Sequence, residues 1–299
     1  MDHYSRREFV KSQSILLLGG IAGGNLFVQS HKRRVEVDAH LWVYASKFPP
    51  DWDATPVLDE VFSDLKYAGY DGVEVMESIL RHDSAVIRLN ELKQQYQLPV
   101  RGTSYYGNMW DRKEHNKITE DIEQVVEKLH QVGGTMIGLT VGDAGRLKTE
   151  SELDDQAELL KKLMVICKKY EVQPNLHNHT FEVANGMHDL KGTLSRIPDV
   201  KLGPDLNWLI RGGIDPVWFI KKYGKQMVYM HIRDQDAKGK WTESVGEGVT
   251  DFKSIAKALK EINYEGRAAV ELAFDKDPVR AVREDWKLSR VFVHKVFGW

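Results

Sequence analysis

From residue 35 to the C-terminus, short apolar runs alternate with longer runs whose apolar residues recur at helical spacing. We expect strands at eight short runs, which span residues 35–43, 72–76, 99–105, 135–141, 172–178, 200–205, 227–232 and 267–272. We expect helices at residues 58–68, 84–96, 118–132, 152–170, 188–196, 216–223, 252–262 and 278–296. Strands that alternate with helices form a parallel sheet, because each helix returns the chain to the same edge. The sequence therefore predicts an α/β fold.

The number of units favours a closed barrel over an open sheet. Eight strand–helix units in roughly 260 residues match the usual size of a (β/α)8 TIM barrel. A doubly wound open sheet is the alternative, since periodicity does not distinguish the two. No Gly-x-Gly-x-x-Gly follows the first expected strand, which leaves dinucleotide binding without support. No low-complexity linker divides the chain, so we predict a single (β/α)8 barrel over residues 31–299.

Composition excludes several other classes of protein. Apolar residues make up 42% and charged residues 29% of the 299 residues, as in folded soluble proteins. The formal charge of −2 leaves no basic excess for a phosphate backbone, so we predict no nucleic-acid partner. A single cysteine, Cys167, excludes a disulfide framework and a multi-cysteine zinc site. No apolar run reaches the ~20 residues of a membrane span.

Residues 1–30 have the pattern of an export signal. The segment Ser5-Arg6-Arg7-Glu8-Phe9-Val10-Lys11 precedes a weakly apolar stretch over residues 15–28, and the paired arginines resemble a twin-arginine signal. The alternative is a basic N-terminus with a chance Arg-Arg pair, in a cytoplasmic protein. We predict a periplasmic or extracytoplasmic location, and residues 31–299 then carry a formal charge of −3.

Metal-binding side chains stand at the ends of four consecutive expected strands. These residues are His177, Asp205, His231 and Glu271. In a barrel the carboxyl ends of the strands meet at one rim, where the chemistry of the fold takes place. Two imidazoles and two carboxylates suit one divalent ion of Mn, Zn, Co or Fe, and suit Ca²⁺ poorly. We predict a metal site formed by these four residues.

Other polar and aromatic residues are expected around the same rim. We expect His179 to face away from His177 and to support the ligands, contact substrate or act as an acid. Glu182 follows three residues later, and Glu74 ends the second expected strand as a second base, a substrate contact or a structural partner. Aromatic rings stack on the C–H faces of sugars, so we expect a sugar platform. Its candidates are Trp42, Tyr105 and Trp208.

Six motifs together resemble one known family. They are Asp71-Gly72-Val73-Glu74, His177-Asn178-His179-Thr180-Phe181-Glu182, Asp205-Leu206-Asn207-Trp208 with Gly212-Gly213-Ile214-Asp215-Pro216, His231-Ile232-Arg233-Asp234, Gly246-Glu247-Gly248 and Val270-Glu271. Over about residues 35–297 the chain resembles the xylose-isomerase-like barrel family, also described as sugar phosphate isomerases/epimerases. The resemblance implies one divalent metal, held here by His177, Asp205, His231 and Glu271, and it implies a homo-oligomer.

The resemblance also implies a mechanism, from which this chain departs at one residue. Epimerases of the family use glutamates on strands five and eight, on opposite faces of the substrate. His177 stands where they carry the first glutamate, which favours one-base chemistry by Glu271, with Glu182 and His179 as further catalytic candidates. Arg233 replaces the family's usual lysine and is expected to contact substrate.

We therefore expect an enzyme that acts on a sugar or oxidised sugar. The leading expectation is a divalent-metal-dependent isomerase or epimerase that removes a proton next to a carbonyl through a metal-stabilised enediolate. A 3-keto-glycoside lyase or hydratase would use the same site for β-elimination. A DNA-repair nuclease of the endonuclease IV type is the remote alternative, since it needs more ligands and a basic groove. A non-catalytic sugar-binding protein would not require the complete ligand set. Export would make sugar phosphates unsuitable substrates.

Overall fold

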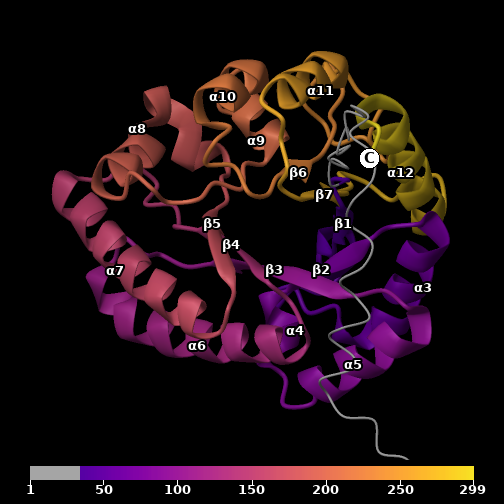
Figure 1. The fold of residues 1–299 in the computed structure, drawn as a ribbon, viewed down its shortest axis with the longest axis horizontal. Coiled ribbons are helices and arrows are strands. Elements are labelled where there is room, and N and C mark those ends of the chain that lie inside the picture. The colour runs from indigo at the N-terminus through magenta and orange to yellow at the C-terminus, as the bar shows by residue number, and fades with distance from the viewer. Residues whose placement is uncertain (1–33) are drawn as a thin grey trace, which may run out of the picture. The chain divides into compact units, whose positions relative to one another are not determined.

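The computed structural model describes residues 34–299, and the twin-arginine-type segment lies outside these residues. Seven parallel strands form one sheet in the order β5-β4-β3-β2-β1-β7-β6, with the helices packed around it (Figure 1). The strands are β1 (Val37–His40), β2 (Gly72–Met76), β3 (Val100–Tyr106), β4 (Met136–Thr140), β5 (Gln173–Leu176), β6 (His231–Ile232) and β7 (Ala268–Glu271). The first strand pairs with both β2 and β7, so the sheet curls back on itself.

The segment expected as the sixth strand fills the gap between β5 and β6. It makes isolated parallel bridges from Leu202 to Leu176 and Met227, and from Asp205 to His231. Pro204 has no N–H group to donate, which prevents a continuous ladder here. The prediction of a (β/α)8 TIM barrel is confirmed, with this strand reduced to single bridges.

The helices cover the outside of the barrel. They are α2 (Trp42–Ala45), α3 (Leu58–Ala68), α4 (Glu77–Arg81), α5 (Ala85–Tyr96), α6 (His115–Gln131), α7 (Glu150–Lys169), α8 (Thr180–Arg196), α9 (Leu206–Arg211), α10 (Pro216–Tyr223), α11 (Phe252–Glu261) and α12 (Val282–Phe297). Two short 3-10 helices span Thr55–Val57 and Arg112–Glu114. Several boundaries differ from expectation, and β6 and α12 each begin four residues after the predicted start, at His231 and Val282. The first strand ends at His40 because α2 begins at Trp42, and α8 begins eight residues before the predicted start, with non-helical residues 184–187 inside it.

Helix α7 shows how the sequence determines this packing. The Thr149 hydroxyl accepts the N–H of Glu152, and the Glu152 carboxylate accepts that of Thr149, which closes a capping box at the start of the helix. Its apolar face, including Leu160 and Cys167, is buried against the barrel. Burial raises the pKa of Cys167 to about 12, which agrees with a packing role for this thiol. No helix in residues 34–299 is long and apolar enough to span a membrane.

Candidate active site

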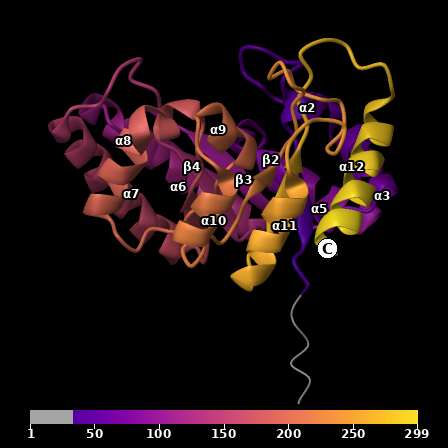
Figure 2. The same cartoon turned by 90° about the horizontal axis from the view of Figure 1, so that it is seen from above.

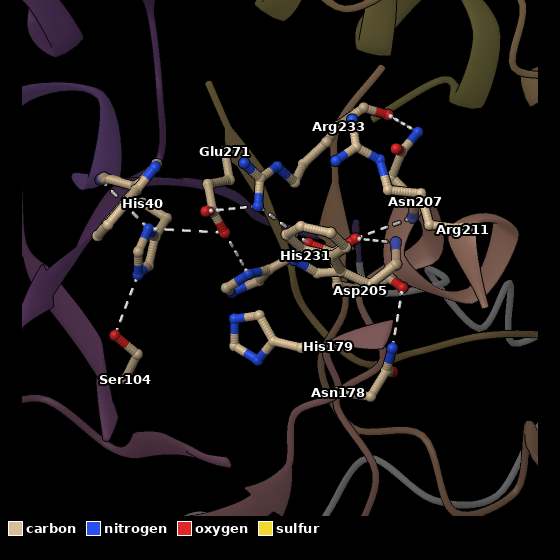
Figure 3. A network of polar contacts seen from close by, with 12 residues as sticks. His40, Ser104, Asn178, His179, Asp205, Asn207, Arg211, His231, Arg233 and Glu271 are labelled. Atoms are coloured by element: carbon tan, nitrogen blue, oxygen red, sulfur yellow. Dashed lines mark hydrogen bonds and ion pairs between the residues drawn. The ribbon is translucent and has the colours of Figure 1, made fainter. Parts of the chain in front are cut away.

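The strand register places three polar side chains at one level of the barrel. His40 on β1 is the register partner of Glu74 on β2 and of Glu271 on β7. Asp205 forms a bridge to His231, whose strand β6 pairs with β7 at the same rim. All five side chains are buried, and Figure 3 shows His40, Asp205, His231 and Glu271 converging at the carboxyl ends of the strands.

His231 lies between two carboxylates. Its Nδ1 is 2.8 Å from Glu271 Oε2 and its Nε2 is 2.8 Å from Glu74 Oε2. Burial alone would lower the pKa of His231, but Glu74 and Glu271 outweigh burial and raise this pKa to about 10. Glu74, predicted as a second base, a substrate contact or a structural partner, is thus in contact with a predicted metal ligand.

Glu271 is held in its ionised form. Burial favours the neutral carboxyl, yet Arg233, His40 and His231 hold the pKa of Glu271 well below its usual range. The Arg233 Nη1 atom is 2.9 Å from Glu271 Oε1. Arg233, predicted to contact substrate, therefore lies at the centre of the site and holds the carboxylate in place.

The donor set fits a divalent cation. His177, Asp205 and His231 each offer a ligand atom, and these atoms all lie within 4.8 Å of one another. The Oδ1 atom of Asp205 accepts the first N–H groups of α9, from Asn207 at 2.8 Å and Trp208 at 2.9 Å. Its Oδ2 atom is buried with no hydrogen-bond partner, and burial raises the pKa of Asp205 to about 6. Arg233 Nη1 lies 3.7 Å from Oδ2, beyond hydrogen-bond distance. A buried carboxylate oxygen without a hydrogen-bond donor, close to ring nitrogens of His177 and His231, is an arrangement that a bound cation would complete.

His177 and His179 lie on the same side of the chain. Their ring centroids are 5.1 Å apart, so the expectation that His179 faces away from His177 is wrong. Residues two apart on an extended segment share a face, and β5 ends at Leu176 just before them. Burial lowers the pKa of His179 to about 4 and that of His177 well below its usual value, so both are neutral at pH 7.

Glu182 accepts a hydrogen bond from the backbone of His179. Its Oε2 accepts the N–H of His179 at 2.6 Å, and its Oε1 accepts the N–H of Val141 at 3.2 Å. This carboxylate therefore ties the end of β4 to the start of α8, and burial raises its pKa well above the usual value. The structure places Glu182 next to the predicted site in a supporting position.

The aromatic candidates fall in different places. Trp208 lies 5.5 Å from His179 and 5.4 Å from the Arg233 guanidinium, and its indole N–H is buried without a partner. Trp42 sits half-buried on α2, 5.4 Å from the Trp52 ring. The Tyr105 hydroxyl instead donates to Asp121 of α6 at 2.8 Å.

Tyr105 faces the helices because alternate residues of a strand face opposite sides. Ser104, its neighbour on β3, contacts His40 inside the barrel at 3.1 Å. The structure therefore does not bring Tyr105 to the site, and Tyr106 is the half-exposed tyrosine of this strand end.

Two further residues, Trp241 and Arg211, lie at the rim, and neither was predicted from the ends of the strands. Trp241 packs against the Arg233 guanidinium at 3.9 Å and lies 5.1 Å from Trp208, and the Arg211 guanidinium lies 3.4 Å from the Trp241 ring. Trp241 belongs to the loop after β6, where no periodic pattern marks it. Its position beside a Gly-Lys dipeptide is its only sequence signal.

Residues 62–290 match the family model described as xylose isomerase-like TIM barrel. The chain belongs to this family. An inosose dehydratase from Clostridium tetani is 23% identical over 286 residues, which cover 84% of this chain and 93% of that protein. The resemblance inferred from the motifs is confirmed.

Two solved structures share the xylose isomerase-like barrel. A D-allulose 3-epimerase from Methylomonas sp. superposes with a TM-score of 0.72 at 16% identity, covering 88% of this chain and 98% of its own. A 3-keto-D-glucoside 4-epimerase from E. coli gives a TM-score of 0.65 at 18% identity, with 86% and 100% coverage. Both likenesses show the fold, and these relatives agree with an enzyme of the isomerase, epimerase or lyase kind.

Proposed function

We propose that this family member is a carbohydrate lyase that removes a proton beside a carbonyl and eliminates water or an alcohol from the neighbouring carbon. The observation that carries the proposal is the histidine, His177, at the place where an epimerase needs a glutamate on the second face of its substrate. His177 is a neutral imidazole, whereas Glu271 is ionised and is oriented by Arg233 and His231. Both oxygens of Glu182 accept backbone N–H groups, and burial raises the pKa of this carboxyl well above its usual value.

The four predicted ligands would hold the divalent ion that the family implies. His177, Asp205 and His231 converge, and Glu271 lies 2.8 Å from His231. A divalent ion there would supply Lewis acidity to the substrate carbonyl. Mn, Zn, Co and Fe all suit this mixed nitrogen and oxygen set.

The chain's own groups provide the proton transfers. The Glu271 carboxylate is ionised, as a proton acceptor must be, and Arg233 keeps it oriented. We propose that Glu271 takes the proton from the carbon beside the carbonyl. The same carboxyl group then returns that proton to the oxygen leaving from the next carbon, on the same face. The C–H and C–O bonds break, a C=C bond forms, and one molecule of water or alcohol departs.

An isomerase that moves a proton along one face would also need only one base. The name of the curated relatives, inosose dehydratase, favours elimination over this second candidate. Two-face epimerisation at C3, as named for the Methylomonas relative, is the reaction that a histidine in place of the second glutamate supports least.

The test follows product formation in D2O with the metal-loaded protein. We expect an inosose to lose water and a nitrophenyl 3-keto-glucoside to release nitrophenol, while D-fructose gains no deuterium. Glu271→Gln removes turnover, and the exposed Glu265→Gln, just before β7, serves as the matched control. Formation of a C3 epimer from D-fructose, with solvent deuterium at C3, would overturn the proposal.

We also propose export to an extracytoplasmic compartment, which would make free sugars and glycosides better substrates than sugar phosphates. The support is the Arg6-Arg7 pair with its following apolar stretch. A fusion of residues 1–40 to a reporter that is active only after export tests this directly, with Arg6→Lys/Arg7→Lys as the control. Export that is unaffected by the double substitution would count against a twin-arginine route.

A further inference from the structure

A cavity lies beside the proposed active site. It is a cleft of about 530 Å³ between the loop after β6 and the loop after β7, within the size range of ligand pockets. Figure 2 shows the two loops rising together beyond the barrel, on the side opposite the end of α12. The strands that lead into these loops end at His231-Ile232 and at Glu271, so the cleft adjoins the reacting centre.

The cleft is held open by bonds between and within its loops. Asp275 Oδ2 accepts the backbone N–H of Trp241 at 2.8 Å, and Glu243 Oε1 accepts the backbone N–H of Val279 at 3.0 Å. The carboxylate of Asp234 accepts the N–H groups of Gly246 and Gly248, each at 2.9 Å. A cleft with fixed walls needs little ordering when a ligand binds, which favours affinity.

Trp241 forms the wall between the cleft and the catalytic carboxylate. Its ring contacts the Arg233 guanidinium at 3.9 Å, and Arg233 in turn lies 2.9 Å from Glu271. Two side chains, those of Trp241 and Arg233, therefore lie between the cleft and Glu271. A substrate whose reacting ring lies over Glu271 could extend a second ring across the edge of Trp241.

The lining offers both signs of charge and two aromatic surfaces. The aromatic side chains are those of Trp241 and Phe274, both half-buried. The charged lining residues are Asp236, Glu243, Glu247, Asp275, Lys240, Lys276 and Arg280. Within residues 34–299, Lys240 and Lys276 form no ion pair, whereas Arg280 contacts Glu247 at 2.8 Å. Hydroxyl groups both donate and accept hydrogen bonds, so a neutral polyhydroxylated ring suits this mixed lining better than a charged ligand.

We propose that this cleft binds a second sugar residue, so that the substrate is an oxidised glycoside of at least two rings. The inference rests on the proposed function for the position of the reacting ring. The second sugar would be the part that leaves on elimination, and the cleft would select for it.

Binding measurements on the full chain test the cleft without turnover. We expect calorimetry to show that cellobiose binds at least about tenfold more tightly than methyl β-D-glucoside, because only cellobiose fills the cleft. Phe274→Ala should weaken cellobiose binding about tenfold and leave methyl glucoside binding unchanged. Trp218→Ala, a 42% exposed tryptophan on α10, is the control and should change neither. Equal affinities for the two sugars, no cellobiose binding at millimolar concentration, or an unaltered Phe274→Ala variant would each overturn the proposal.

Kinetics with the 3-keto forms separate this inference from the proposed function. We expect Phe274→Ala to raise KM for 3-keto-cellobiose about tenfold while kcat and the KM for methyl 3-keto-glucoside stay unchanged. Elimination from both substrates with equal KM values would leave the lyase standing and overturn the cleft. Tighter binding of cellobiose in a protein that eliminates from neither substrate would support the cleft and overturn the lyase.

Discussion

Two charged clusters lie at opposite ends of the barrel and differ in how their charges are paired. The rim cluster at the carboxyl ends of the strands comprises the buried residues His177, Asp205, His231, Arg233 and Glu271. The base cluster at the amino ends comprises Glu36, Asp38, Arg101 and Arg267. Both contain carboxylates beside arginines, so composition alone does not distinguish their roles.

The carboxylates of the base cluster are fully paired. Arg267 donates to both oxygens of Asp38, at 2.9 and 3.0 Å, and also contacts Glu36 Oε2. Arg101 lies 3.2 Å from Glu36 Oε1. Each of the four carboxylate oxygens thus accepts from an arginine, which is the pairing expected where charge serves only to hold strands together.

The rim cluster contains buried polar atoms that have no hydrogen-bond partner, and one of them is a carboxylate oxygen. Asp205 Oδ2 and Arg233 Nε are buried without a hydrogen-bond partner, and so are the neighbouring His179 Nδ1 and Trp208 Nε1. The base cluster has one such atom, Arg101 Nε, and it is a nitrogen. Buried polar atoms without a partner are costly, so a fold retains them where a ligand supplies the missing contact. A carboxylate oxygen without a hydrogen-bond donor, more than charge, therefore distinguishes the rim of the barrel from its base.

The largest expected effect is on activity. Glu271→Gln should lower kcat by about 10³–10⁴-fold or more, because it removes the proton acceptor. The free energy of unfolding should also fall, by about 3–5 kcal/mol, because Arg233 stays buried without its carboxylate partner, so kcat is compared per folded molecule. Steady-state kinetics and urea unfolding check both statements. Retained turnover would place the catalytic base elsewhere.

A substitution in the base cluster should lower stability and leave activity nearly unchanged. Arg267→Met should cost about 3–5 kcal/mol of unfolding free energy at pH 7, because it leaves Asp38 buried without its cation. The kcat of the folded variant should remain within about twofold. Arg101→Met, which removes a partly exposed ion pair with Glu36, is the matched control and should cost less than about 1 kcal/mol.

The cost of Arg267→Met should depend on pH. Burial raises the pKa of Asp38 from 3.8 to about 6, although Arg267 opposes the shift. A raised carboxyl pKa means that ionisation in the folded protein lowers stability as pH rises through 3.8 to 6, with no such loss below this window. Loss of Arg267 raises that pKa further, so the variant should be closer to wild type at pH 4 than at pH 7. An equal cost at both pH values would contradict this assignment.

Stability should also reveal the cation at the rim. In chelator-treated protein, Mn²⁺ or Zn²⁺ at about 100 times its Kd should raise the unfolding free energy by about 2.7 kcal/mol. Asp205→Asn should abolish that gain and stabilise the metal-free protein by about 1–2 kcal/mol, because burial raises the pKa of Asp205 to about 6 and Arg233 offsets only part of the cost of its charge. Urea unfolding with and without the ion measures both effects. A full gain in Asp205→Asn would exclude Asp205 as a ligand.

The sequence predicted the position of a residue correctly where that position depends only on the direction of its strand. Parallel strands end at one rim, so the order of the elements was sufficient to place Asp205, His231 and Glu271 together. The sequence did not show which alternate residues of a strand face inward. Tyr105 was predicted at the site, but it faces Asp121, and Ser104 faces the barrel interior. Periodicity of two does not say which alternate residues face inward.

Contacts that depend on strand register or on the course of a loop could not be predicted from the sequence. The contact between Glu74 and His231 joins residues 157 positions apart and exists because β1 lies between β2 and β7. Trp241 and the cleft beside it belong to loops whose course follows from hydrogen bonds such as that from Trp241 to Asp275. The fold and the convergence of His177, Asp205 and His231 could thus be predicted, while the charge pairing and the cleft could not.

The smallest expected effect tests whether the two clusters are independent. Tyr229 lies between them, with its hydroxyl 3.4 Å from Asp38 Oδ2 and its ring centroid 5.7 Å from that of His231. Tyr229→Phe should cost about 1 kcal/mol, because it removes the long hydrogen bond to Asp38 and a hydrogen bond to Glu74. Its coupling energy with Arg267→Met, from a double-mutant cycle, should reach about 0.5 kcal/mol, and kcat should change less than about twofold. A tenfold loss of kcat in Tyr229→Phe would mean that the base cluster tunes the rim through this residue, and the barrel would then contain one connected polar network instead of two.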